Sequence, residues 1–158
     1  MKRQMYAASA AVIAFAYAAQ AQAQAAPQEV EAVIVTAQKR EQNLQDVPIV
    51  VNVVSGQQLQ DAGVRDVKDL QLLAPGLSVT SSTGGAQTSI RIRGVGTIGD
   101  NVGLESSVGT VVDGVYRARS GVAFNDLGEM ERVEVLKGPQ GTVFGKNTSA
   151  GVINVITK

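Results

Sequence analysis

The chain has 158 residues, with 14 basic and 14 acidic side chains and therefore no net charge. This balance removes the electrostatic attraction on which nucleic-acid binding depends, so no nucleic-acid partner is expected. The sequence contains neither histidine nor cysteine, which excludes His-based triads, cysteine nucleophiles, Cys/His zinc sites and disulfides.

Residues 1–25 have the layout of a secretory signal peptide. A short basic start (MKR) precedes an apolar run over residues 7–19, and alternating Ala and Gln residues follow it, which is the order of regions that export signals show. The apolar run is shorter than the roughly 20 residues of a transmembrane helix. We therefore expect export and cleavage after Ala23 or Ala25.

A short β-prone run precedes the expected domain. Residues 32–37 (AVIVTA) form this run, and residues 38–46 (QKREQNLQD) after it are polar without apolar periodicity, which predicts a linker or a weak helix. Folded structure is expected from Val47 onward. Residues 49–54 (IVVNVV) are nearly all β-branched or apolar and suit a strand that is covered on both faces.

Two short helices are predicted next. Ser55 and Gln58 have the spacing of a capping box, and Gly63 provides a stop for the helix that they begin. A second helix is expected over residues 66–73, with Asp66 as its cap and Leu70 and Leu73 on its buried face.

Glycine-rich segments separate the remaining predicted strands. Alternation in residues 88–93 (TSIRIR) places the isoleucines on one face of a strand and Arg91 and Arg93 on the other. Asp113-Gly114 is a strong hairpin signal. A brief helical turn is expected within residues 124–131. Further strands are expected at residues 108–112, 133–136 and 151–157, with loops over 81–87 and 94–107. The sum is an α+β fold with one small mixed β-sheet, short helices and long Gly-rich loops.

Two groups of charged residues allow more than one interpretation. Glu129, Glu131 and Glu134 cluster in sequence, and we interpret them as a solvated face because nothing nearby builds an acid–base pair. The face with Arg91 and Arg93 is either solvated or a guanidinium surface that meets carboxylates of another body. Composition does not choose between these two alternatives.

The order of five segments resembles the N-terminal plug domain of TonB-dependent outer-membrane receptors. These segments are residues 33–37 (VIVTA), 38–51 (QKREQNLQDVPIVV), 90–97 (IRIRGVGT), 111–116 (VVDGVY) and 131–158 (ERVEVLKGPQGTVFGKNTSAGVINVITK). The resemblance covers essentially the whole exported chain, and the last segment is the most specific.

The resemblance implies a division of the chain into a signal peptide (1–25), a TonB box with its linker (26–46) and the plug domain (47–158). The TonB box would bind the protein TonB by pairing with it as an added β-strand. ExbB and ExbD would energise TonB. Its residues would be Val33, Ile34, Val35, Thr36 and Ala37. The plug would fill a barrel of about 22 strands.

Contacts with the barrel and the transported compound follow from the same resemblance. The barrel-contacting residues would be Arg91, Arg93 and Lys137. The loops that face the ligand would contain Ser81, Ser82, Gly99, Asp100, Asn101, Tyr116 and Arg117. The barrel is absent from the chain, so we expect a fragment of a longer receptor or a truncated product.

The expected function is that of the gate of an outer-membrane transporter. It would take up an iron–siderophore complex or a similar scarce nutrient and would be neither an enzyme nor the carrier of a cofactor or metal. The alternative is a free-standing periplasmic binding or interaction module with the plug fold.

Overall fold

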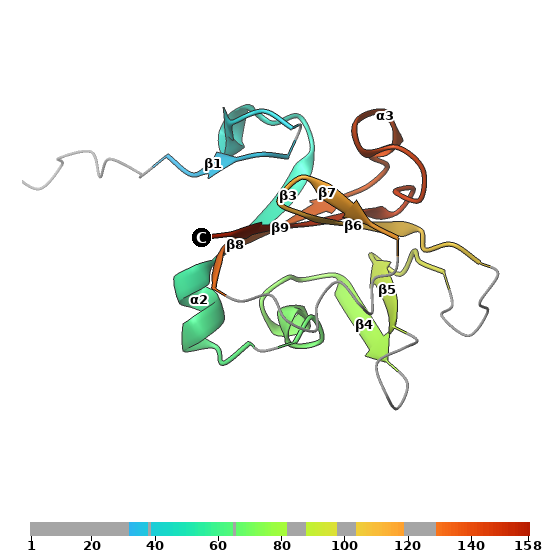
Figure 1. The fold of residues 1–158 in the computed structure, drawn as a ribbon, viewed down its shortest axis with the longest axis horizontal. Helices are drawn as coiled ribbons and strands as arrows, with labels where there is room; N and C mark the ends of the chain where they lie inside the picture. The colour runs from blue at the N-terminus through green and yellow to red at the C-terminus, as the bar shows by residue number, and fades with distance from the viewer. Residues whose placement is uncertain (1–31, 38, 65, 82–87, 98–103, 119–128) are drawn as a thin grey trace, which may run out of the picture. The chain divides into compact units, whose positions relative to one another are not determined.

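The computed structural model describes residues 32–37, 39–64, 66–81, 88–97, 104–118 and 129–158. The expected signal peptide therefore lies outside the described residues. Residues 32–158 form one unit, in which short helices pack on a central mixed sheet (Figure 1). Within the described ranges, no helix combines the length and the apolar character that crossing a membrane would need.

The central sheet has five strands in the order β3-β8-β9-β6-β7. These strands are β3 (Val50–Ser55), β8 (Met130–Lys137), β9 (Gly151–Thr157), β6 (Val108–Val112) and β7 (Val115–Arg117). Strands β6 and β9 run parallel, whereas the other neighbours are antiparallel. The mixed sheet confirms the predicted α+β class, and β8 also takes up Met130 and Glu131, where a helical turn was expected.

A tight hairpin joins β6 to β7, as predicted. Asp113 and Gly114 adopt positive φ angles of 49° and 80°, the conformation of a two-residue turn that matches the twist of the strands. The Asp113 carboxylate accepts hydrogen bonds from the main-chain N–H and the hydroxyl of Thr157, at 2.9 and 2.8 Å. The turn is thereby tied to the end of β9.

The two predicted helices are both present but differ in kind. Helix α2 (Gly56–Asp61) begins at Ser55 with the complete capping box that Gln58 closes. The expected helix over 66–73 is instead the 3-10 helix η2 (Asp69–Leu72). A single turn makes too few hydrogen bonds to offset the unfavourable free energy of α-helix nucleation. The segment therefore forms the i→i+3 hydrogen bonds of a 3-10 helix. Leu70 is buried, as expected.

A separate hairpin of β4 (Leu77–Ser81) and β5 (Thr88–Ile92) lies beside η2. No pattern in the sequence predicted β4. Ile90 and Ile92 are buried as expected, but Arg93 is not part of the strand. It has a φ of 54° and forms, with Gly94 (φ 80°), a turn that bridges Ile92 to Val95. Arg93 therefore does not share a strand face with Arg91.

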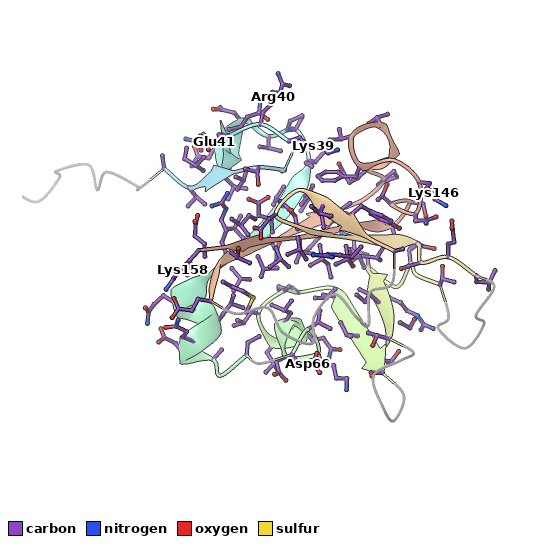
Figure 2. The ribbon with its side chains drawn as sticks, viewed as in Figure 1. Lys39, Arg40, Glu41, Asp66, Lys146 and Lys158 are labelled. Carbon is purple, nitrogen blue, oxygen red and sulfur yellow. The ribbon has the colours of Figure 1, made fainter. Side chains whose placement is uncertain are left out.

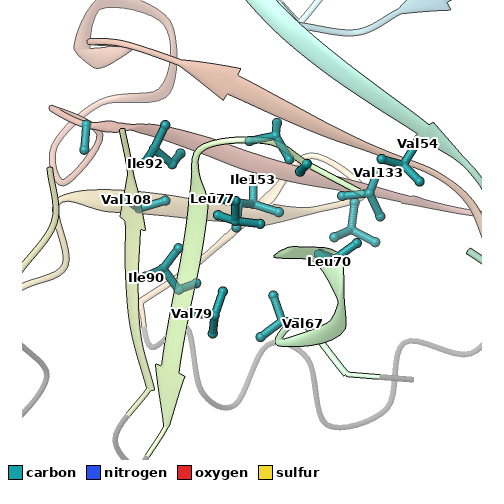
Figure 3. Packing of buried hydrophobic residues seen from close by; sticks show 14 of the residues in the cluster. Val54, Val67, Leu70, Leu77, Val79, Ile90, Ile92, Val108, Val133 and Ile153 are labelled. Carbon is teal, nitrogen blue, oxygen red and sulfur yellow. The ribbon is translucent and has the colours of Figure 1, made fainter. Parts of the chain in front are cut away.

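Each face of the central sheet carries its own apolar cluster. The first cluster joins the sheet to α2, η2, β4 and β5 (Figure 3). It contains Leu59, Leu70, Ile90, Val133 and Ile153 among its members. The second cluster lies on the opposite face, because alternate strand residues such as Leu136 and Val152 point there.

The second face is covered by the chain ahead of β3 and by the short helix α3 (Gly141–Phe144). Strand β1 (Ile34–Val35) pairs with β2 (Gln42–Asn43), and the 3-10 helix η1 (Leu44–Asp46) follows. Of the expected linker or weak helix over 38–46, the described residues 39–46 belong to the folded unit and end in the 3-10 helix η1. Polar residues of this stretch pair through their main chain, and Leu44 packs against the second cluster.

Candidate functional site

The segment of residues 33–37, here called the N-terminal segment, lies on the second face of the sheet. Val35 and Ala37 are completely buried, whereas Val33 and Ile34 remain 44% and 46% exposed. The two buried side chains join Val111, Leu136 and Val152 in the second cluster. From Ile34 to Ala37 the exposure alternates as in a half-buried strand, with one side attached to the sheet.

Main-chain pairing fixes which edge of the segment is occupied. The Leu44 N–H donates to the Val33 carbonyl at 2.9 Å, and Ile34 is opposite Asn43 in the next pair. Hydrogen-bonded pairs alternate in an antiparallel ladder. The main-chain groups of Val33 and Val35 therefore point toward β2, while those of Ile34 and the N–H of Thr36 point toward the other edge. The Thr36 carbonyl accepts a hydrogen bond from the Lys39 N–H at 2.9 Å.

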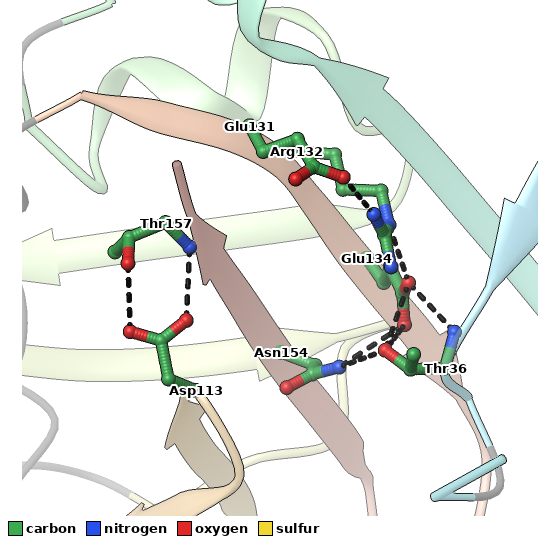
Figure 4. A network of polar contacts seen from close by, with 7 residues as sticks. All are labelled: Thr36, Asp113, Glu131, Arg132, Glu134, Asn154 and Thr157. Carbon is green, nitrogen blue, oxygen red and sulfur yellow. Dashed lines mark hydrogen bonds and ion pairs between the residues drawn. The ribbon is translucent and has the colours of Figure 1, made fainter. Parts of the chain in front are cut away.

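The carboxylate of Glu134 occupies that other edge at Thr36. Glu134 Oε1 accepts a hydrogen bond from the Thr36 main-chain N–H at 2.9 Å. The Thr36 hydroxyl also donates to both carboxylate oxygens, at 3.2 and 3.3 Å. Figure 4 shows this contact between the N-terminal segment and β8. A single carboxylate thus binds the segment through its main chain and its side chain.

Two further side chains hold this carboxylate in place. Arg132 Nε donates to Glu134 Oε1 at 2.9 Å, and Asn154 Nδ2 donates to Glu134 Oε2 at 3.1 Å. Asn154 Nδ2 also lies 3.2 Å from the Thr36 hydroxyl oxygen. We call Thr36, Arg132, Glu134 and Asn154 the Glu134 network. Its donors compensate a buried charge that would otherwise be strongly unfavourable.

Burial of Glu134 corrects the expectation of a solvated acidic face. Glu129 and Glu131 are exposed, as predicted, but Glu134 is completely buried. It lies in the middle of a strand that is covered on both faces, directly opposite Asn154 in the register of β8 and β9. The signal in the sequence was that Glu134 and Asn154 each lie between two apolar neighbours in a predicted strand, because buried polar residues need partners.

A cavity of about 520 Å³ lies beside the network. Its lining includes Thr36, Arg132 and Asn154 from the network, together with Lys39 and Phe144. Lys39 Nζ is 5.6 Å from the centre of the Phe144 ring, a cation–π distance. Figure 2 shows Lys39, Arg40 and Glu41 together in the stretch that follows the segment. Solvent therefore reaches the edge of the network.

The structure brings two of the expected barrel-contacting residues together. Lys137 Nζ donates to the Pro75 carbonyl at 2.7 Å. Burial, and secondly the charge of Arg93, hold the pKa of the Lys137 ammonium below its ordinary value. Among the described residues, no salt bridge involves either cation. Arg91 belongs to β5, where it is opposite Ser78.

The expected ligand-facing loops are only partly within the described residues. Ser82, Gly99, Asp100 and Asn101 lie outside them. Ser81 ends β4 opposite Thr88. Tyr116 and Arg117 belong to the edge strand β7 rather than to a loop. Tyr116 packs against the second cluster, and its hydroxyl accepts a hydrogen bond from Asn147 Nδ2 at 3.2 Å. In the same described ranges, no acidic cluster has the arrangement of a metal site.

Comparison with known proteins places this geometry in a family. A family model described as the TonB-dependent Receptor Plug Domain matches residues 43–152. The vitamin B12 transporter BtuB of Vibrio vulnificus is 38% identical over 132 residues, which are 80% of this chain and 20% of the relative. The iron-regulated outer membrane virulence protein of Vibrio cholerae serotype O1 is 34% identical over 140 residues, 81% of this chain and 20% of the relative.

A solved structure shows the same fold. The ferric yersiniabactin uptake receptor FyuA from Yersinia pestis superposes with a TM-score of 0.63 at 35% identity, over 70% of this chain and 17% of that receptor. The chain spans about a fifth of the length of the curated relatives it matches.

Proposed function

Because the chain belongs to the family of TonB-dependent receptor plug domains, we propose that it is the gate of an outer-membrane transporter. The transported compound would be an iron–siderophore complex or a similar scarce nutrient. The observation that carries this proposal is the family match over residues 43–152. Relatives named a vitamin B12 transporter and a ferric yersiniabactin uptake receptor support it.

We infer that the N-terminal segment is the TonB box. It lies directly ahead of the matched region, it forms a strand, and its first two residues are exposed. TonB, energised by ExbB and ExbD, adds a strand to this segment and pulls on it. Strand addition draws its affinity from main-chain groups, so the segment couples energy through its backbone.

The surrounding assembly is proposed on the same basis. The plug fills a barrel of about 22 strands in the outer membrane, after export by the signal peptide of residues 1–25. The names of the relatives are those of transporters and outer-membrane receptors, and the chain acts as a gate rather than as an enzyme. Ser81, Ser82 and residues 99–101 belong to loops that face the transported compound.

Arg93 and Lys137 are proposed to face acidic groups of the barrel wall. Their mutual proximity and the lowered pKa of Lys137 indicate a cationic spot that an external carboxylate would stabilise. Arg93→Ala in the full-length receptor is expected to loosen the plug and to raise the leak of small antibiotics into the cell. Unchanged permeability would mean that Arg93 is merely solvated.

The coupling role is tested by two substitutions in the full-length receptor, expressed in cells that contain TonB. Val35→Pro removes the main-chain donor that faces β2 and fixes φ in the middle of the segment. This distorts the strand with which TonB must pair, so cells should bind the substrate at their surface but fail to import it. Ile34→Ala changes an exposed side chain and should import normally. Normal uptake by the proline variant would show that the coupling segment lies elsewhere.

A further inference from the structure

Two binding partners, Glu134 and an added strand, would need the same main-chain N–H of Thr36. The main chain of the N-terminal segment has one edge on β2 and another that includes Ile34 and Thr36. On this second edge, the Thr36 N–H is already bound by Glu134. A strand that pairs along this edge needs the same N–H, because its hydrogen bonds use alternate residues.

The first edge offers no unhindered alternative. Pairing along Val33 and Val35 would require separation of β1 from β2 and removal of Val35 from a site where it is completely buried. A partner strand therefore has access to the segment only after some of the contacts that hold the segment on the plug break. Of these contacts, those to Glu134 fasten the segment directly to the central sheet.

We propose that Glu134 is a positioning residue that keeps the N-terminal segment closed to strand addition until the Glu134 network opens. This inference rests on the proposed function, and it assigns the closed state to one carboxylate with Arg132 and Asn154 as its supports. Opening breaks the bonds from Thr36 to Glu134 and leaves the carboxylate with its bonds to Arg132 and Asn154. The buried charge therefore keeps donors after the segment leaves.

Polar contacts suit a segment that must be released repeatedly. A hydrogen bond exchanged for one to water changes stability little, whereas a buried donor or acceptor without a partner is unfavourable. The cavity beside the network, lined by Thr36, Arg132 and Asn154, gives water a route to these groups as they separate. The network thus stabilises the closed state without making it permanent.

The test uses the full-length receptor in outer-membrane preparations without substrate. Glu134→Gln keeps the shape of the side chain but removes its charge and replaces one of the two acceptor oxygens, which bind Arg132 Nε and Asn154 Nδ2, with an amide donor. Thr36→Val removes the hydroxyl contacts and leaves the sheet unaltered, while Thr36→Ser restores them. Glu131→Gln is the matched control, because Glu131 pairs with Arg132 but is exposed and does not contact Thr36.

Two measurements report on the segment. A spin label is attached at Ile34→Cys, since these 158 residues contain no other cysteine and Ile34 is exposed. Binding of the periplasmic domain of TonB is titrated in parallel. Loss of a charge-assisted hydrogen bond corresponds to about a tenfold or larger change in an equilibrium constant. Apparent affinity rises with the fraction of competent molecules.

Glu134→Gln and Thr36→Val should each mobilise the label and raise the substrate-free affinity for TonB by about tenfold, with surface binding of the substrate unchanged. Thr36→Ser and Glu131→Gln should match the unaltered receptor. The inference is overturned if Glu134→Gln and Thr36→Val leave label mobility and TonB affinity unchanged, or if Glu131→Gln has the same effect as Glu134→Gln. It is also overturned if both variants lose substrate binding, since Glu134 would then only stabilise the plug.

Failure of this inference is distinct from failure of the proposed function. If Val35→Pro abolishes uptake while Glu134→Gln leaves the label immobile, the segment couples energy but Glu134 does not control it. If TonB binds no variant and uptake survives Val35→Pro, the proposed role of the segment itself is wrong.

Discussion

The two faces of the central sheet pack against the rest of the chain in different ways. On the first face, aliphatic side chains from α2, η2, β4 and β5 meet those of β8 and β9 (Figure 3). On the second face, the N-terminal segment combines two buried apolar residues with a buried carboxylate (Figure 4). The packing density of such an aliphatic core is close to that of an organic crystal, so its elements separate only if the core is disrupted. A hydrogen-bonded segment can exchange its partners, so the second face is suited to release.

The largest expected effect comes from removing the buried carboxylate. Glu134→Ala leaves Arg132 Nε and the Thr36 N–H without this acceptor, and the Asn154 amide keeps only the Thr36 hydroxyl. Breaking a buried charge pair by deleting one partner destabilises by about 3–5 kcal/mol. Urea titration of the purified receptor should show this loss for the plug, together with early exposure of the segment. A loss below about 1 kcal/mol would contradict a fully compensated buried charge.

A truncation on the first face should be nearly as destabilising but should leave the segment attached. Ile153 is completely buried in the first cluster, and Ile→Ala changes at such sites cost about 2–5 kcal/mol. Urea titration of Ile153→Ala should show this loss, while a label at residue 34 stays immobile in the folded molecules. A mobile label would mean that the two faces are not separable.

A smaller, local effect is expected when the segment itself loses packing. Val35→Ala removes the equivalent of two methyl groups from a completely buried site, which corresponds to roughly 1.5–2 kcal/mol. Because Val35 belongs only to the docked segment, this change should raise the released fraction more than tenfold and leave the unfolding of β8 and β9 unaltered. Proteolysis of residues 33–46 in membranes would measure the released fraction. An unchanged cleavage rate would show that apolar burial does not hold the segment.

The smallest effect is expected at an exposed ion pair, in contrast to the buried pair of Arg132 and Glu134. Lys146 Nζ lies 2.7 Å from Glu105 Oε1, and both side chains are more than half exposed. The hydrogen bond from Lys146 is the main cause that lowers the pKa of Glu105. Any stabilisation by this depressed carboxyl is present above its unfolded pKa and is lost as pH falls through its folded value.

Lys146→Gln should therefore raise the pKa of Glu105 toward its ordinary value of 4.5 in an NMR titration. Thermal unfolding at neutral pH should not change measurably, because solvent and salt screen exposed pairs. A clear drop in melting temperature would show that surface charge matters as much as the Glu134 network.

Local patterns in the sequence predicted most of the central sheet, the cap of one helix and one hairpin turn. Ser55 and Gln58 form the expected capping box, and Asp113-Gly114 forms the expected turn. These features depend on neighbours within a few residues, so a short stretch of sequence determines them. The turn at Arg93 was missed because strand alternation was extended one residue too far, although Gly94 marked the end.

The attachment of the N-terminal segment was not predictable in the same way. Thr36 and Glu134 are separated by 98 positions, and Glu134 and Asn154 by 20. The polar stretch of residues 39–46 lacks periodicity, yet Gln42–Asn43 within it form β2 because β1 is present to pair with them. The register of β8 and β9 brings Glu134 opposite Asn154. Only tertiary structure places these groups in contact.

Hydrogen exchange in the full-length receptor tests most directly whether the second face releases the segment while the first face stays intact. Exchange is followed by mass spectrometry in the unaltered receptor and in Glu134→Gln, without TonB, because strand addition by TonB would itself protect the main chain of the segment. Residues 33–37 should lose protection in Glu134→Gln, since the Thr36 N–H is bound by Glu134 in the closed state, while the β8 residues 133–136 and the β9 residues 151–155 keep theirs. Protection that persists at 33–37, or that is lost together with β8 and β9, would contradict release of the segment from a stable sheet.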